Sequence, residues 1–314
     1  MSNAVQSDLN SSYHLFYGEL YKEAAMLNLL AEQLAENREV RGSFLDKERE
    51  RLHKVVRPFF QNLRADYDVT HFYFHTLERN TFLRVHYPKM HGDPIDRFTL
   101  NEAEATGSVS YGLELGPMGT LTLRVVMPWR VDDRIIGYLE LGKEIDQVLD
   151  EMKKILEIDF VLIVNKDHLN KNSWGKGKHG PPVEGGDWNQ FPDFVVFAMS
   201  REKMPPVIRA DLARPHHLHE NLILEFREAG RLHLAGFAPL LDASNKDIGE
   251  IILIKDFTNL KTVAHRVTLV VLFGYFFSVL LYAGFVYVYL RRIRFEGKGA
   301  GNKDIQSSDQ DLNP

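Results

Sequence analysis

Apolar residues in the first 64 positions recur at steps of three and four, which is the spacing of one face of an α-helix. Residues 13–40 are predicted to form one amphipathic helix, and residues 44–64 a second. The segment from Ser43 to Asp46 fits a capping box at the start of the second helix, and Pro58 predicts a kink within it. The two helices form either a stalk that pairs with a second copy or a layer on the core of their own chain.

Beyond Asp68 the apolar residues alternate with polar ones, which is the pattern of half-buried strands. Two helices interrupt this pattern, at 95–107, where Gly107 ends the helix, and at 143–158. The predicted strands are 69–77, 81–88, 112–116, 120–129 and 135–142.

The pattern is then repeated, beginning with a strand and turn over 159–169 and a loop over 171–187. Residues 230–260 resemble residues 119–148 element by element: an alternating strand, a proline, a polar turn, an Ile-Gly pair and an apolar strand. A period of ~110 residues indicates duplication of a domain rather than a solenoid.

Residues 267–290 form an uncharged run of 24 residues that is followed by Arg291, Arg292 and Arg294. As a helix this run is ~36 Å long, enough to cross a hydrocarbon core of ~30 Å. Five basic residues in the 15 that follow it, against three in the 15 before it, place the C-terminus on the cytoplasmic side. The first 14 residues are polar and lack the apolar stretch of a signal peptide. Export of the preceding part therefore requires a signal or a first spanning helix upstream of Met1, or the chain is a fragment.

These patterns predict an α+β fold: a long N-terminal helix, two antiparallel-sheet modules and one C-terminal transmembrane helix. The expected divisions are a helical stalk, a membrane-distal module, a membrane-proximal module, the transmembrane helix and a short cytoplasmic tail without an output domain. Their boundaries are 1–66, 67–158, 159–264, 265–291 and 292–314.

Composition excludes several classes of function. The net charge of −5 gives no electrostatic basis for binding nucleic acid. The absence of cysteine excludes disulfides, cysteine-ligated clusters and thiolate catalysis. Neither a GxSxG nor an HExxH motif is present, so an enzyme is not expected.

The first module contains a series of motifs: Phe82 to His86 with Pro88, Gly92-Asp93, Arg97, Gly112 to Gly116, Leu123 to Val126 with Pro128, and Ile136 to Gly142. Together these motifs resemble the double Cache (PAS-like) sensor domains, and in particular the third double-Cache family. Such domains occur in bacterial chemoreceptors, sensor histidine kinases and diguanylate cyclases. The resemblance implies two PAS-like Cache modules and ligand sensing by the membrane-distal one.

Alternation along the strands places residues two apart on one face. If the polar faces of the strands lie on the same side of one sheet, they form a ligand-binding patch. Guanidinium groups there suit a carboxylate, and carboxylates suit an amine, so a carboxylate or amino-acid-like ligand is expected. The predicted ligand-binding residues are Tyr73, His75, Arg84, His86, Asp93, Glu114, Arg124, Tyr138 and Glu140. The alternative is a wet sheet face on which Arg124 and Glu140 form an ordinary cross-strand pair.

Two other motifs give weaker evidence for a binding site. His216, His217 and His219 lie within four residues, but adjacent histidines share one tetrahedral ion only in a tight turn, so a solvated loop is favoured over a metal site. The sequence GKGKHG at 175–180 lacks the spacing of a phosphate-binding loop. Neither a metal nor another cofactor is predicted.

The sequence therefore predicts a single-pass sensor in the cell (inner) membrane, with its N-terminal part periplasmic or extracellular. Its expected partners are a small polar molecule, the lipid bilayer, a second copy in a homodimer and a separate signalling output protein. The alternative is an accessory protein that presents its ligand to a separate transducer.

Overall fold

The structure is a computed structural model, and it describes residues 2–116, 119–174, 184, 186–214 and 223–306. Residues 1–256 form one compact unit, and residues 257–314 form a second. The predicted histidine cluster and most of the 171–187 loop lie outside the described residues.

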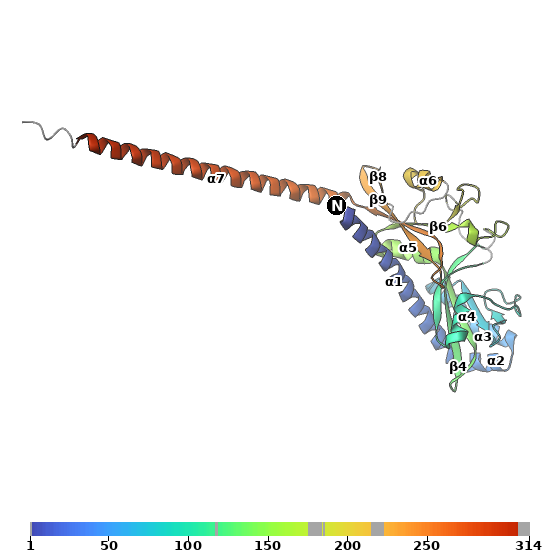
Figure 1. The fold of residues 1–314 in the computed structure, drawn as a ribbon. Coiled ribbons are helices and arrows are strands. Elements are labelled where there is room, and N and C mark those ends of the chain that lie inside the picture. The colour runs from blue at the N-terminus through green and yellow to red at the C-terminus, as the bar shows by residue number, and fades with distance from the viewer. Residues whose placement is uncertain (1, 117–118, 175–183, 185, 215–222, 307–314) are drawn as a thin grey trace, which may run out of the picture. The chain divides into compact units, whose positions relative to one another are not determined.

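Two five-stranded antiparallel sheets dominate the first unit, and both have the same strand order. Figure 1 labels β4 of the first sheet and β6, β8 and β9 of the second. The first has the order β2-β1-β5-β4-β3 and the second the order β7-β6-β10-β9-β8. The first sheet consists of β1 (His71–His75), β2 (Thr81–Arg84), β3 (Ser110–Leu115), β4 (Leu121–Val131) and β5 (Arg134–Glu144). The second consists of β6 (Asp159–Asn165), β7 (Phe194–Met199), β8 (Ile223–Glu228), β9 (Arg231–Leu241) and β10 (Asp247–Asp256). The identical orders confirm the predicted duplication and the α+β class.

The N-terminal helices differ from the prediction at their boundaries. The first helix, α1 (Ser2–Ala35), starts earlier and ends earlier than expected, because Asn37 caps a separate helix, α2 (Arg38–Leu45). The side-chain Oδ1 of Asn37 accepts hydrogen bonds from the backbone N–H groups of Glu39 and Val40. The capping box predicted at Ser43 is wrong, since Ser43 lies inside α2 and its hydroxyl donates to the carbonyl of Glu39.

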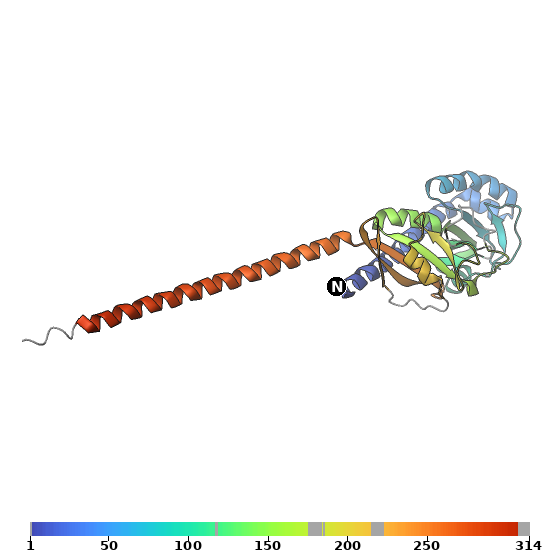
Figure 2. The same ribbon diagram turned by 90° about the horizontal axis from the view of Figure 1, so that it is seen from above.

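The third helix, α3 (Arg49–Asp66), begins five residues later than the predicted start at 44. Lys47 separates it from α2 with a φ of +58°, a left-handed conformation that a helix cannot continue through. Pro58 lies inside α3, and the helix is continuous across it. Figure 2 shows α2 and α3 beside the first sheet.

The apolar stripe of α1 is buried against the sheets of its own chain. The helix contacts β3, β4 and β5 of the first sheet and β9 and β10 of the second. The buried residues of the stripe are Leu9, Phe16, Leu20, Ala24, Leu27, Ala31 and Leu34. One α-helix therefore supports both sheets, while pairing with a second copy stays a prediction.

Smaller elements complete the two modules. The first contains α4 (Phe98–Thr106), which ends at Gly107 with a φ of +63°, and α5 (Ile145–Leu156) leads to the second. The second also contains a short 3₁₀ turn, η1 (Lys166–His168), and α6 (Pro206–Leu212). Alternation did not predict β7, α6 or β8.

The last helix, α7 (Thr258–Gln306), contains the uncharged run. Its segment Arg266–Arg292 is long and apolar enough to cross a membrane, which makes it a candidate transmembrane helix.

Candidate functional site

The predicted ligand-binding residues come together through the register of the first sheet. Tyr73 of β1 lies opposite Arg84 of β2 on one side and Glu140 of β5 on the other. Arg124 of β4 lies opposite Gly142, two residues from Glu140. Residues opposite each other in adjacent antiparallel strands point to the same face. The polar side chains therefore share one face, and α1, α2 and α3 pack on the apolar side of this sheet.

Glu140 is at the centre of a buried charged cluster on this face. Its Oε1 accepts from Arg97 at 2.7 Å and from Arg124 at 2.5 Å, and its Oε2 lies 2.8 Å from Nε2 of His75. The Glu140 side chain is 0% exposed. Burial alone would raise the pKa of Glu140, but the two guanidinium charges and the His75 hydrogen bond outweigh it and hold that pKa well below its usual range.

Arg124 also joins the cluster to Glu114 of β3. Its Nε lies 3.4 Å from Oε2 of Glu114, and its side chain is 4% exposed. The other carboxylate oxygen of Glu114 accepts from the backbone N–H of Thr99 in α4 at 2.8 Å. Glu114 thus connects the sheet to the first turn of α4. Of the alternative, the wet face is wrong because these charges are buried, but the cross-strand pair of Arg124 and Glu140 is present.

The segment 85–97 closes the same face from the edge of β2. Gly92 N–H donates to the Thr81 carbonyl at 2.7 Å, and Thr81 N–H donates to the Asp93 carbonyl at 2.9 Å. Arg84 binds both carboxylate oxygens of Asp93, at 2.7 and 2.5 Å. The guanidinium groups of Arg84 and Arg97 lie 5.5 and 5.1 Å from the ring centroid of Tyr73. Cation–π contacts of this kind hold the segment on the sheet.

Three histidines adjoin the cluster, and all three are neutral near neutral pH. Burial lowers the pKa of His75, lowers that of His71 to about 2 and lowers that of His86 to about 4. A neutral His75 beside the Glu140 carboxylate carries its proton on Nε2, so its Nδ1 is a hydrogen-bond acceptor. His86 packs edge-on against the Tyr73 ring, with 4.8 Å between centroids.

Tyr138 lies on the same face but apart from the charges. Its side chain packs with Leu100 and Ala103 of α4 and with Val126. Burial raises its pKa. Of the predicted residues, Tyr73, His75, Arg84, Asp93, Glu114, Arg124 and Glu140 are joined by contacts, His86 borders them, and Tyr138 belongs to an apolar cluster.

Several buried polar atoms on this face lack a hydrogen-bond partner among the described residues. They are His75 Nδ1, Thr81 Oγ1, Thr99 Oγ1, Thr122 Oγ1, Glu114 Oε2 and Arg124 Nε, of which the last two form an ion pair with each other at 3.4 Å. Unpaired buried polar atoms are costly and rare in folded proteins. Six of the nine such atoms among the described residues lie on this face.

Sequence reasoning missed part of this site. Arg97, His71, Thr81, Thr99 and Thr122 were absent from the predicted set. Arg97 lies in a loop, where strand alternation gives no information, although its place in the family motifs was a usable signal. The threonines carry no charge and resemble ordinary strand or helix residues.

The family model for the double sensory domain of two-component sensor kinases, dCache_3, matches residues 2–260. The chain belongs to this double-Cache family. It is therefore a sensory domain attached to a candidate transmembrane helix.

Solved structures similar to this double-Cache chain include sensor domains from several bacteria. The periplasmic domain of Vibrio cholerae LuxQ is 12% identical, with 79% of this chain and 98% of that chain covered and a TM-score of 0.47. The sensor domain of the Vibrio cholerae histidine kinase DctB is 12% identical, with 81% and 98% covered and a TM-score of 0.46. The ligand-binding domain of the Pseudomonas fluorescens chemoreceptor CtaA, solved with L-serine, is 11% identical, with 82% and 99% covered and a TM-score of 0.40. No curated protein sequence matches the chain closely enough to count as a relative.

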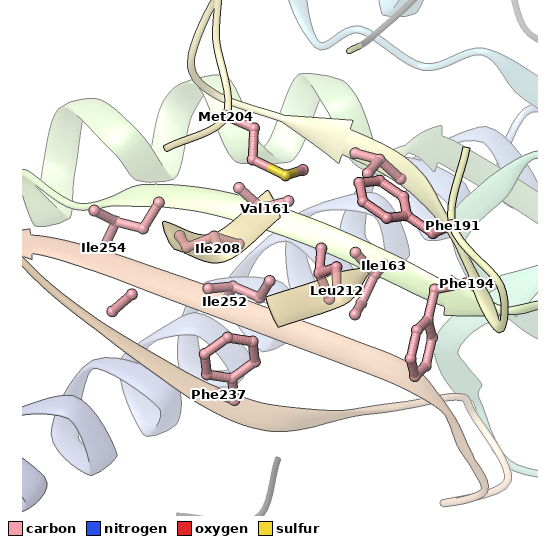
Figure 3. Close-up of a cluster of buried hydrophobic side chains, with 12 residues drawn as sticks. Val161, Ile163, Phe191, Phe194, Met204, Ile208, Leu212, Phe237, Ile252 and Ile254 are labelled. Carbon is pink, nitrogen blue, oxygen red and sulfur yellow. The ribbon is translucent and has the colours of Figure 1, made fainter. Parts of the chain in front are cut away.

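The second Cache module fills the equivalent face with apolar side chains. Ile252 lies opposite Val161 and Phe237, just as Glu140 lies opposite Tyr73 and Val126. By the same alignment Ile163 replaces His75 and Ala235 replaces Arg124. These residues form a core with Ile208 and Leu212 of α6 (Figure 3). The two Cache modules thus share a topology but differ in the chemistry of this face.

Among the residues that the structure describes, no group of three histidine or acidic side chains is placed to hold a metal ion.

Proposed function

We propose that this double-Cache chain is a membrane-anchored extracytoplasmic sensor that binds a small amino-acid-like ligand in its distal module. The binding site is the charged face of the first sheet. The observation that carries the proposal is the contrast between the modules: sheets of identical order carry a cluster of buried charges on this face in one and an apolar core in the other. Burying a charged group costs several kcal/mol of desolvation, and the second module fills the equivalent face with apolar side chains that do not carry this cost.

The charge balance favours a ligand with no net charge. Three guanidinium groups, on Arg84, Arg97 and Arg124, face three carboxylates, on Asp93, Glu114 and Glu140. An α-amino acid adds one charge of each sign and leaves this balance unchanged. Its carboxylate would take bonds from Arg97 and Arg124, and its ammonium would donate to Glu114 Oε2 and His75 Nδ1. A dicarboxylate would leave two uncompensated charges in a buried place.

In this proposal the ligand competes with Glu140 for its two guanidinium partners. Glu140 lies on β5, which leads into α5 and the second module. The second module continues from β10 into α7, which would carry the change across the inner membrane to a cytoplasmic C-terminus. Binding then needs only to shift a two-state equilibrium by a few kcal/mol. The output would come from a partner or a further domain, and two copies would act together.

The test is a thermal-shift and calorimetric titration of the full chain in detergent with α-amino acids, the matching carboxylic acids and the matching amines. A ligand that binds the folded state raises the melting temperature. We expect an amino acid to bind at least about tenfold more tightly than either analogue, since each analogue lacks one charged group.

The discriminating variant is Thr122→Val, which removes an unpaired buried hydroxyl without changing size or charge. Loss of an unsatisfied polar atom is expected to leave the unliganded protein as stable or more stable, while the affinity falls about fivefold to tenfold. Thr106→Val is the matched control, because Thr106 is exposed on α4. An unchanged affinity in Thr122→Val together with Thr99→Val would remove this face as the binding site.

A further inference from the structure

A cavity lies away from the charged face, where α1, the β3–β4 pair and the β9–β10 turn meet. Its volume is about 470 Å³. Four tyrosine side chains line it: Tyr13, Tyr17 and Tyr21 from α1, and Tyr111 from β3. Such a concentration of phenol rings around one cavity is unlike the arginine-rich face of the same module.

The walls of the cavity are fixed by hydrogen bonds between the two modules. Ala243 N–H, in the β9–β10 turn, donates to the Leu113 carbonyl of β3 at 2.8 Å. Leu241 N–H donates to the Tyr17 hydroxyl at 2.9 Å. The turn also fits tightly against Gly112, since a Cβ atom there would lie 2.6 Å from Cβ of Ala243. The cavity is therefore a built feature of the junction.

The tyrosine rings form two edge-to-face pairs. Tyr13 and Tyr17 have centroids 5.0 Å apart at 68°, and Tyr21 and Tyr111 have centroids 5.8 Å apart at 62°. Rings at steep angles to one another present their π faces in several directions around the same space. Tyr21 and Tyr111 are 58% and 44% exposed, so a small molecule can reach the cavity from solvent.

The charge around the cavity is negative. Asp242 lines it, and neither lysine nor arginine is among the lining residues. Oδ1 of Asp242 accepts hydrogen bonds that hold the turn, from the N–H and hydroxyl of Ser244 and from the N–H of Lys246. Burial raises the pKa of Tyr17, with the nearby charge of Asp247 adding to the rise. The phenol stays protonated, and a second carboxylate lies close to the rings.

We propose that this cavity binds a small organic cation, a quaternary or protonated ammonium group, between the tyrosine rings and Asp242. The negative π faces of aromatic rings attract such cations, and a cage of several rings is a common way to recognise them. This site is independent of the amino-acid site proposed for the charged face. Because its walls come from both modules, its occupant would also stabilise their junction.

The test is calorimetry of the full chain in detergent with choline, and with 3,3-dimethyl-1-butanol as the uncharged molecule of the same shape. We expect choline to bind at least about tenfold more tightly than the alcohol. Tyr111→Leu and Asp242→Asn should each weaken choline binding by about threefold to thirtyfold. Asparagine keeps the Oδ1 acceptor that holds the turn, so this variant removes mainly the charge.

Tyr67→Leu is the matched control, because Tyr67 is exposed at the end of α3 and does not line the cavity. If Tyr111→Leu fails to fold, Tyr21→Leu replaces it, since Tyr21 is more exposed. Equal binding of the alcohol would show an apolar groove and overturn the proposal. Absence of choline binding up to about 10 mM would also overturn the proposal. This holds as well if binding is absent because a second copy of the chain covers Tyr21.

Discussion

At the scale of single residues, Glu140 is the group on which the charged cluster depends. Glu140→Gln keeps the shape of the side chain but leaves Arg97 and Arg124 facing a neutral amide in a buried place. Removing one partner of a buried ion pair costs about 3 to 5 kcal/mol. We expect the free energy of unfolding of the first unit to fall by about that amount.

Denaturant unfolding followed by tryptophan fluorescence measures this loss, because Trp129 is buried in the first module against Phe44. Glu202→Gln is the control, since Glu202 is exposed, and such surface changes usually stay within about 0.5 kcal/mol. A loss for Glu140→Gln no larger than the control's would mean that the guanidinium groups find water or other partners easily.

His71 predicts how stability depends on pH. Burial, with the Arg124 charge as the next cause, lowers its pKa from 6.5 to about 2. Below pH 6.5 the unfolded chain therefore binds a proton that the folded chain does not. The stabilisation is fully present above pH 6.5 and is lost as the pH falls, by about 1.4 kcal/mol per pH unit.

We expect His71→Gln to have a shallower loss of stability than the parent chain between about pH 6.5 and pH 5. Unfolding curves at several pH values measure the two slopes. The lowered pKa values of His75 and His86 steepen both curves alike in this window, and the lowered pKa of Glu140 acts below it, so the difference between the two slopes reports His71. Equal slopes would mean that His71 is protonated in the folded state.

The residues of the charged face could be predicted where polar and apolar residues alternate along a strand. They could not be predicted where this alternation is absent. Alternation within β1 and β5 is enough to place Tyr73 with His75 on one face and Tyr138 with Glu140 on one face. Arg97 was missed because it lies in a loop, and its position depends on how the 85–97 segment returns along β2. Burial of the cluster also depends on that segment and on α4, and so was not visible in the strands themselves.

At the scale of elements, one buried ion pair ties α1 to the first sheet. Nζ of Lys143, in β5, lies 3.1 Å from Oε2 of Glu23, and the Lys143 side chain is 1% exposed. Glu23→Ala removes this counter-charge from a buried ammonium group. We expect it to lower the free energy of unfolding by about 3 kcal/mol.

The second half of this test is the double variant Glu23→Ala, Lys143→Met. Replacing a buried pair by apolar side chains is often neutral, so the double variant should recover most of the stability lost by Glu23→Ala alone. Denaturant unfolding of Glu23→Ala, of Lys143→Met and of the double variant measures the coupling energy. A double variant as unstable as the sum of its parts would show that Lys143 relies on its other contacts.

Helices and strands could be predicted where a clear hydrophobic period extends over many residues. The break between α1 and α2 was missed because the apolar stripe continues across Asn37, and the cap decides the boundary. In the second module, β7 is an uninterrupted apolar run, for which periodicity cannot separate strand from helix. The short helix α6 spans only about two turns, too few for a helical period to show.

At the scale of the molecule, the chain uses one sheet topology twice with different side-chain chemistry on the same face. Duplication was visible in the sequence at the β9–β10 hairpin, where the proline, turn and Ile-Gly pair repeat those of β4–β5. The difference in face chemistry depends on the register that aligns Glu140 with Ile252 and Arg124 with Ala235. The same sheet order thus accommodates either a buried charged cluster or an apolar core.

This contrast predicts that the first module can be made to fold without the charges at the centre of the cluster. The variant His75→Phe, Glu114→Gln, Arg124→Met, Glu140→Ile replaces the centre of the cluster with side chains of similar volume. Apolar replacement of a buried charged network is often neutral or stabilising. We therefore expect it to be at least as stable as Glu140→Gln alone in denaturant unfolding, while the thermal shift with an amino-acid ligand disappears. A variant that folds and still responds to that ligand would place the binding site elsewhere. A variant less stable than Glu140→Gln would instead mean that the cluster is structural, with the charges holding α4 and the 85–97 segment on the sheet.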